Sequence, residues 1–160
     1  MTRSLLESVP EVDPHSIVEH NWSQPGENPQ DLIRWDFASS SALFSGYALV
    51  GDRLRQLNFE IAGTTAVEQF IHEFGIPRYA DVGSPPVPVT ACEVSLGWPD
   101  AGLIAGYYEE GSFAICHRVE EGGRLPHDLP ISRIVLFPAG AEFQPELPCC
   151  QRYPFPGLDR

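Results

Sequence analysis

The chain is a series of short segments in which apolar and polar residues alternate, and turns rich in glycine and proline separate these segments. After Gly51-Asp52, for example, Leu57, Phe59 and Ile61 alternate with polar residues. This alternation is typical of a strand with one buried face. The expected strands are residues 43–50, 53–61, 78–82, 89–98, 103–108, 113–119 and 131–137. Most connections between them have the length of a hairpin, so the pattern predicts a mostly antiparallel sheet.

One segment has the spacing of a helix rather than of a strand. Val67, Phe70 and Phe74 fall on one helical face, Thr65-Ala-Val-Glu68 has the spacing of a capping box, and Gly75 marks the end. A helix of this kind covers one face of a sheet. The sequence therefore predicts an α+β domain, with a mostly antiparallel sheet of six or seven strands and one main amphipathic helix packed on one face.

The length and the distribution of proline predict how the domain is organised. A chain of 160 residues fits one domain, and 42% hydrophobic residues are enough to build a core. Residues 1–36 are rich in proline and in acidic and amide side chains, which predicts an extended N-terminal arm. Residues 138–160 carry prolines and glycines in irregular order, which predicts an irregular C-terminal tail. We expect a single domain over residues 1–160 with these two extensions.

Residues 64–108 resemble a known structural unit. The expected helix ends in Phe74-Gly-Ile-Pro77, and the following strands contain Trp98-Pro-Asp-Ala-Gly-Leu103. This order resembles the helix-then-meander unit of small domains like the β-lactamase inhibitor protein and the outer-membrane-assembly lipoproteins. The resemblance implies a two-layer α+β fold that binds other proteins, and it brings no catalytic residues. The chain departs from these families because the sequence as given has neither a leader nor a lipidation cysteine near its start.

Charge and composition exclude several classes of function. Ten basic and 22 acidic residues give a formal net charge of -12, so nucleic acid phosphates and anionic lipids would repel the chain. Every basic residue is arginine, which excludes mechanisms that need a phosphate-binding, Schiff-base or dyad lysine. The sequence has no glycine-rich phosphate loop followed by a helix. We therefore expect no nucleic acid partner and no cofactor.

Apolar segments and cysteines set the expected location and redox state. No apolar run approaches the length of a membrane span, so we expect no membrane insertion and a cytoplasmic location for the chain as given. If a leader has been removed, the location is the envelope or the extracellular space. Cys92 and Cys116 lie in apolar runs, where free cysteine packs as a small core residue. With Cys149 and Cys150 in the tail, we expect four reduced thiols rather than a disulfide framework.

Three groups of side chains are candidates for metal or nucleophilic chemistry. His15, Glu19 and His20 lack the helical zinc spacing, because the two histidines would point about 140° apart on a helix. Cys116 and His117 are adjacent on an expected strand, where neighbours point to opposite faces. The pair Cys149-Cys150, with His117 or His127, has no further metal ligands at fixed spacing. We therefore expect no catalytic residues and no metal site.

Aromatic and acidic residues in the meander are the best candidates for binding. Tyr107 and Tyr108 occupy both faces of one expected strand, and Trp98 adds a side chain of the kind enriched at binding hot spots. The acidic pairs Glu109-Glu110 and Glu120-Glu121 fall at two meander turns, at opposite ends of the sheet, where they would steer a basic partner. The predicted contacts are Trp98, Tyr107, Tyr108, Glu109 and Glu110.

These observations favour a non-enzymatic protein-binding or assembly module that presents a sheet face and acidic turns to another protein. Two alternatives stay open. One is a small thiol- or metal-dependent hydrolase around Cys116, His117 or His127. The other is a small-ligand carrier with a pocket between helix and sheet.

Overall fold

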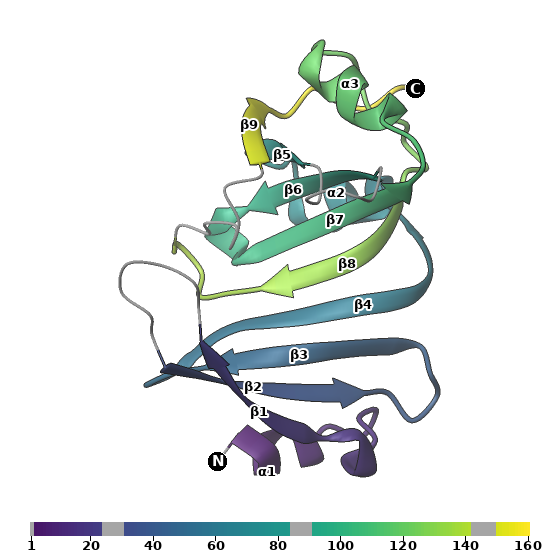
Figure 1. The fold of residues 1–160 in the computed structure, drawn as a ribbon. Coiled ribbons are helices and arrows are strands. Elements are labelled where there is room, and N and C mark those ends of the chain that lie inside the picture. The colour runs from purple at the N-terminus through teal and green to yellow at the C-terminus, as the bar shows by residue number, and fades with distance from the viewer. Residues whose placement is uncertain (1, 24–30, 84–90, 142–149) are drawn as a thin grey trace.

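A single antiparallel sheet organises the molecule. The computed structural model describes residues 2–23, 31–83, 91–141 and 150–160. Its nine strands lie in the order β1-β2-β3-β4-β8-β7-β6-β5-β9 (Figure 1). The strands are β1 (Val18–Ser23), β2 (Asp31–Ala38), β3 (Phe44–Val50), β4 (Leu54–Ala66), β5 (Tyr79–Gly83), β6 (Ala91–Trp98), β7 (Leu103–Glu110), β8 (Pro130–Leu136) and β9 (Cys150–Pro154). β8 lies between β4 and β7, so it joins β1 to β4 with β5 to β7, while β9, near the end of the chain, pairs with β5.

The helices are short and do not form a layer comparable with the sheet. They are α1 (Thr2–Glu7), α2 (Val67–Phe74) and α3 (Ala114–Glu120). The predicted α+β domain with six or seven strands and one main helix is therefore wrong, because the described residues form a nine-stranded, sheet-rich fold with three short helices. None of the helices in the described ranges is long and apolar enough to span a membrane.

The additional strands come from the two ends of the chain, which the sequence pattern predicted to be irregular. Residues 1–36 contain α1, β1 and most of β2 rather than an extended arm, and β9 lies in the expected tail. In β2, Phe37 packs in the core while Arg34 and Asp36 point to the other face, so the alternation exists but is short. β9 ends in Pro154, which an edge strand tolerates because one of its edges needs no ladder hydrogen bonds.

The predicted helix is confirmed as α2, but its start differs from the prediction. Its first flanking residue is Ala66, which makes no side-chain cap, and Thr65 belongs to β4. The capping box is therefore not formed. At the other end, Gly75 has a φ of 81° and its N–H donates to Ile71 O, as the sequence predicts for a glycine that ends a helix.

Residues 113–119, predicted as the third strand of a meander, instead form the N-cap and most of α3 (Ala114–Glu120). The segment fits both patterns, because Phe113, Cys116 and Val119 also lie three residues apart, as on one helical face. Cys116 and Val119 are buried in α3. Gly122 follows the helix and has a φ of 74°, a backbone conformation that favours glycine. Burial on one helical face therefore decides between the two patterns.

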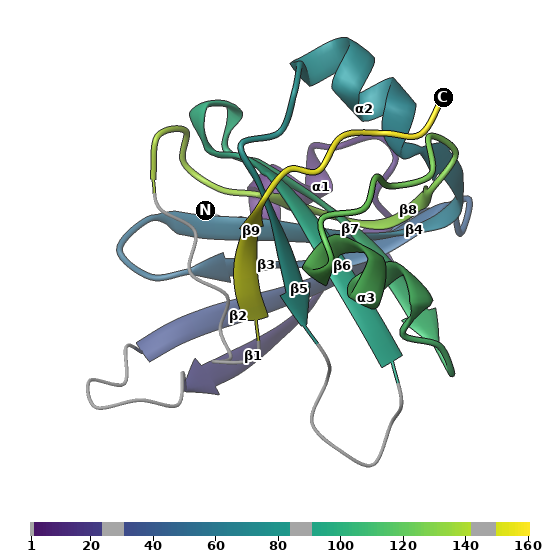
Figure 2. The same ribbon diagram turned by 90° about the horizontal axis from the view of Figure 1, so that it is seen from above.

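A disulfide bond joins Cys92 of β6 to Cys116 of α3, so the prediction of reduced thiols is wrong for this pair. Their Cα atoms are 5.8 Å apart, within the usual range for a disulfide. The helical conformation turns Cys116 toward the sheet, where Cys92 is completely buried. Figure 2 shows α3 next to β6, the strand to which this bond ties it.

Both hydrophobic clusters lie on the same side of the sheet. The larger one packs β5 to β8 against α2 and α3, and the smaller one packs β2 to β4 against α1. Phe59 lies opposite Ile134, and Ile134 lies opposite Ala105, so side chains of both clusters point the same way. We call this the helix side of the sheet and the opposite one the polar side. The polar side is available for a site.

Candidate functional site

The polar side carries a row of residues that lie directly opposite one another on seven neighbouring strands. From β3 to β9 this polar row consists of Ser45, Glu60, Arg133, Gly106, Ser95, Asp81 and Arg152. Acidic and basic residues alternate along it, and Gly106 leaves its centre without a side chain. Beside the row, Leu49, Ile104 and Val135 are buried on the same side, so only part of this side is polar. The polar row is the first element of the candidate site.

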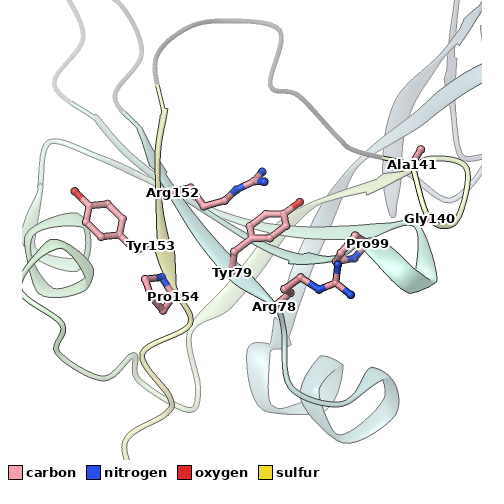
Figure 3. A pocket seen from close by; sticks show the side chains of 8 residues that line it. All are labelled: Arg78, Tyr79, Pro99, Gly140, Ala141, Arg152, Tyr153 and Pro154. Atoms are coloured by element: carbon pink, nitrogen blue, oxygen red, sulfur yellow. The ribbon is translucent and has the colours of Figure 1, made fainter.

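Arg152 combines an ion pair with a stack on a tyrosine ring. It donates Nε to Asp81 Oδ1 at 2.8 Å and Nη2 to Asp81 Oδ2 at 3.0 Å, and its Cζ lies 3.6 Å from the centre of the Tyr79 ring. Figure 3 shows Arg152 reaching from β9 across the ring of Tyr79. A cavity of about 720 Å³ adjoins this cluster. Both arginines on its wall already pair with carboxylates of the chain, Arg152 with Asp81 and Arg78 with Asp100.

The polar side repeats this arrangement on β2 and β3. Arg34 donates Nε to Asp36 Oδ1 at 2.7 Å, and its Cζ lies 3.9 Å from the centre of the Tyr47 ring. His20 Nε2 lies 3.0 Å from the other oxygen of Asp36. The chain thus builds the same arginine–tyrosine–carboxylate arrangement twice on its polar side. The guanidinium group suits it because it is planar and forms directed hydrogen bonds while it stacks.

The end of β7 has a free edge. β8 pairs with β7 only as far as Gly106, which lies opposite Arg133. β7 continues to Glu110 and stays paired with β6 along this length. Within the described parts of the chain, no strand pairs with the other edge of residues 107–110, which we call the β7 edge segment. A strand edge of this kind presents main-chain N–H and C=O groups to another chain.

A cavity of about 450 Å³ lies where β7 separates from β8, and we call it the β7 cavity. Its lining includes Glu60, Glu93, Tyr108, Ser132 and Arg133. Arg133 Nη2 forms an ion pair with Glu93 Oε1. The side chain of Glu60 forms no ion pair or hydrogen bond with any described residue. The cavity therefore holds one carboxylate paired within the chain and one that is not.

A second cavity, of about 340 Å³, shares Glu60 and Arg133 with the β7 cavity. Asn58 lines it and is 5% exposed. The buried Nδ2 of Asn58 has no hydrogen-bond partner among the described residues. Leaving such a donor unpaired costs free energy, so this wall is polar and its donors are not all paired with described residues. The two cavities together hollow the polar side along β3, β4, β8 and β7.

The structure places the five predicted contacts in different environments. Trp98 is 4% exposed and packs in the larger core cluster, so it presents no surface to a partner. Tyr107 and Tyr108 both line the β7 cavity, and Tyr108 is 46% exposed. Glu109 is half-buried and Glu110 is exposed. Four of the five residues thus make up the β7 edge segment, and Trp98 does not belong to the site.

Tyr107 has a perturbed ionisation that gives a measurable test of this geometry. Its pKa is raised from 10.0 to about 12, mainly by burial, then by its hydrogen bond to Glu109 and by the charge of that carboxylate. Folding therefore favours the neutral phenol. We expect its contribution to stability to be complete below pH 10 and to be lost as the pH rises from 10 to about 12, because the unfolded chain ionises first.

A phenolate absorbance titration checks this expectation. The most alkaline tyrosine transition should disappear in Tyr107→Phe and shift to lower pH in Glu109→Gln, because the second variant removes the charge. Tyr153→Phe serves as the control and should leave that transition in place. An unchanged alkaline transition in Tyr107→Phe would contradict the assignment.

The two acidic pairs do not lie at opposite ends of the sheet as predicted. Glu109-Glu110 ends β7, and Glu120-Glu121 lies at the end of α3. The difference arises because the expected third strand is the short helix α3, which the disulfide ties to β6. One acidic pair therefore precedes α3 and the other lies at its end, instead of the two lying at opposite ends of the sheet. Of the two pairs, Glu109-Glu110 belongs to the β7 edge segment.

Within the described parts of the chain, the candidate chemical groups are not assembled into a metal or nucleophilic site. His15 lies in a short 3-10 turn while Glu19 and His20 lie in β1, so they share no helical face. Cys116 has no free thiol because it forms the disulfide. Cys149 lies outside the described residues. Among those described, no group of three His, Cys, Asp or Glu side chains is placed to hold a metal ion.

Sequence reasoning missed the residues that other strands bring to the β7 cavity. Glu60, Glu93 and Arg133 are far apart in the sequence, and they meet because β8 lies between β4 and β7. The available signal was their charge, since each lies inside a strand, where a charged side chain must point away from the core. The strand order that brings them together could not be read from this signal.

Comparisons with protein-family models, curated proteins and solved structures give no match. The resemblance to the β-lactamase-inhibitor-protein-like and outer-membrane-assembly-lipoprotein-like domains therefore stays a prediction. In the structure, α2 is followed by the antiparallel strands β5, β6 and β7. The polar side and the β7 edge segment are therefore the features from which we infer a function.

Proposed function

We propose that this chain is a non-enzymatic protein-binding module that takes up an extended segment of another protein along the β7 edge segment. The observation that carries this proposal is the end of the β7–β8 pairing at Gly106, which leaves four residues in strand conformation with one free edge. An extended segment that adds to such an edge gains main-chain hydrogen bonds, and neighbouring pockets select its side chains.

The surroundings of the edge support this proposal. The β7 cavity lies beside it and offers a pocket of about 450 Å³ to a side chain of the added segment. Tyr108 is 46% exposed, and tyrosine is enriched at binding hot spots because it combines apolar area with a polar end. The net charge of -12 favours a partner surface that is basic. Long-range attraction of this kind weakens as salt screens the charges.

Site-specific photo-crosslinking tests the proposal. A benzophenone amino acid at position 110, next to the free edge, should crosslink one protein in an extract of the organism that encodes the chain. The same group at Glu73, an exposed acidic residue of α2, is the matched control and should not capture that protein. Tyr108→Ala should weaken the capture at position 110 by at least about tenfold, the scale of a hot-spot residue.

Two results of the crosslinking experiment decide whether the proposal holds. A single partner that is captured at position 110, is lost in Tyr108→Ala and binds more weakly at higher salt supports the proposal. The Tyr108→Ala variant must keep the wild-type unfolding transition, so that a loss of binding is not a loss of the fold. If positions 110 and 73 capture the same set of proteins, or neither captures any, the proposal is wrong.

A further inference from the structure

Tyr108 is the exception among the tyrosines that face the polar side. Tyr47 carries Arg34 on its ring, and Tyr79 carries Arg152. Tyr108 also faces the polar side, because it lies opposite Glu93 on β6, but among the described residues no arginine stacks on its ring. The chain therefore builds two complete arginine–tyrosine–carboxylate arrangements and one that has the tyrosine alone.

A carboxylate that could pair with the missing arginine lies in the same cavity as Tyr108. Glu60 lines the same cavity as Tyr108 and has no ion pair with any described residue. The other carboxylate of the cavity, Glu93, is already paired with Arg133. Counting Glu60, Glu93 and Arg133, the charged side chains on the cavity wall have an excess of one negative charge. A single cation from outside the chain would balance it.

We propose that an arginine from the partner's extended segment enters the β7 cavity, stacks on Tyr108 and pairs with Glu60. This inference rests on the proposed function, since the added segment brings the arginine to the cavity. It names the chemistry that the site selects. The arginine completes in the complex the arrangement that Arg34 and Arg152 complete within the chain.

Strand geometry brings this arginine to the correct side. In a strand added along the β7 edge segment, alternate side chains point to the two sides of the sheet. A residue opposite Tyr108 therefore points to the polar side, where the cavity opens, and its two neighbours point to the helix side. The recognised motif is thus one arginine between two residues that point away from the cavity.

Arginine fits this place better than lysine. A guanidinium group is planar, so it can stack on a ring while its edge donates to a carboxylate, as Arg152 does with Tyr79 and Asp81. A lysine ammonium is a compact, strongly hydrated charge and cannot make both contacts in this way. Citrulline keeps the length and the planar shape of arginine but has no charge. Comparing the three side chains therefore separates charge from shape.

Binding of short peptides tests the inference. The probe is a blocked seven-residue peptide of alternating threonine and valine with arginine at its centre, and its matched forms carry lysine, citrulline or glutamate there. Calorimetry and backbone NMR shifts should show the arginine form binding at the β7 edge segment, with the citrulline form about tenfold weaker because both the stack and the ion pair lose the charge. Lysine should fall between them, and glutamate should not bind.

Variants of the protein locate the preference. The ratio of the citrulline to the arginine dissociation constant should fall toward one in Glu60→Gln and in Tyr108→Leu, because each variant removes one of the two groups that recognise the cation. Tyr108→Phe keeps the ring and should keep most of the preference. Glu73→Gln removes an equal charge on α2 and should leave the ratio unchanged. Both dissociation constants are measured on the same variant, so a modest loss of folded protein affects both and leaves their ratio unchanged.

The test distinguishes this inference from the proposed function. If arginine and citrulline peptides bind equally and both shift residues 107–110, the edge binds a segment but the arginine preference is wrong. If the arginine peptide does not bind at millimolar concentration while crosslinking at position 110 identifies a partner, the inference is also wrong and the proposed function stands. If crosslinking fails as well, both are wrong.

Discussion

Removal of the Cys92–Cys116 disulfide is expected to lower the free energy of unfolding by about 3 kcal/mol. The bond closes a loop with a sequence separation of 24 residues, and a crosslink of this span reduces the conformational freedom of the unfolded chain. It also ties α3 to β6 inside the larger core cluster, where Cys92 is 0% exposed and Cys116 is 2% exposed. Urea unfolding with and without a strong reductant measures the effect.

The double variant Cys92→Ala and Cys116→Ala is the matched control for this prediction. Without reductant it should unfold at the urea concentration that unfolds the reduced wild type, apart from the small loss of packing volume. Adding reductant should then change nothing, because no bond remains between these positions. If the wild type and the double variant are equally stable under oxidising conditions, the bond contributes nothing to the fold and the expectation is wrong.

Trp98→Ala is expected to lower the free energy of unfolding by about 3–5 kcal/mol, the cost of removing a large aromatic side chain from a core. The indole packs near Phe70 and Phe74, each with ring centres 6.4 Å away, and its Nε1–H donates to Gly75 O at 2.7 Å. The variant would therefore leave a cavity between β6 and α2. Calorimetric or urea unfolding at neutral pH measures the loss.

Two further variants separate burial from binding. Trp98→Phe keeps a ring and loses the hydrogen bond, so it should cost less than Trp98→Ala. Tyr108→Ala changes an exposed side chain and should alter stability by no more than about 0.5 kcal/mol. If Trp98→Ala unfolds like the wild type and Tyr108→Ala does not, the assignment of one residue to the core and the other to the surface is reversed.

Local patterns predicted the parts of the fold that are stabilised locally. β3, β4, α2 and β6 lie close to their predicted positions, since each is defined by alternation or helical spacing and by neighbouring turns. The segment containing Cys116 was misassigned because its residues fit a strand and a helix equally well, and only packing against β6 decides. β1, β2 and β9 were not predicted as strands, because each is a short alternating segment next to a proline-rich stretch.

The candidate site was predicted only in part for a related reason. Tyr107, Tyr108, Glu109 and Glu110 are consecutive, so their shared place on one strand follows from the sequence alone. The companions of Tyr108 in the cavity, Glu60 among them, come from other strands. Their meeting depends on β8 lying between β4 and β7, and a single sequence carries no signal for this pairing.

The position of β8 also makes the continuity of the sheet depend on long-range pairing. β1 to β4 form one antiparallel group from neighbouring hairpins, and β5 to β7 form another, each with its own hydrophobic cluster. A chain that has made every one of these hairpins still holds two separate half-sheets. They join only when β8 pairs with β4, as in the contact of Arg133 with Glu60, across a long stretch of chain whose closure is entropically slow. Because the β7 cavity includes both of these residues, the cavity is complete only once β8 has joined the two groups of strands.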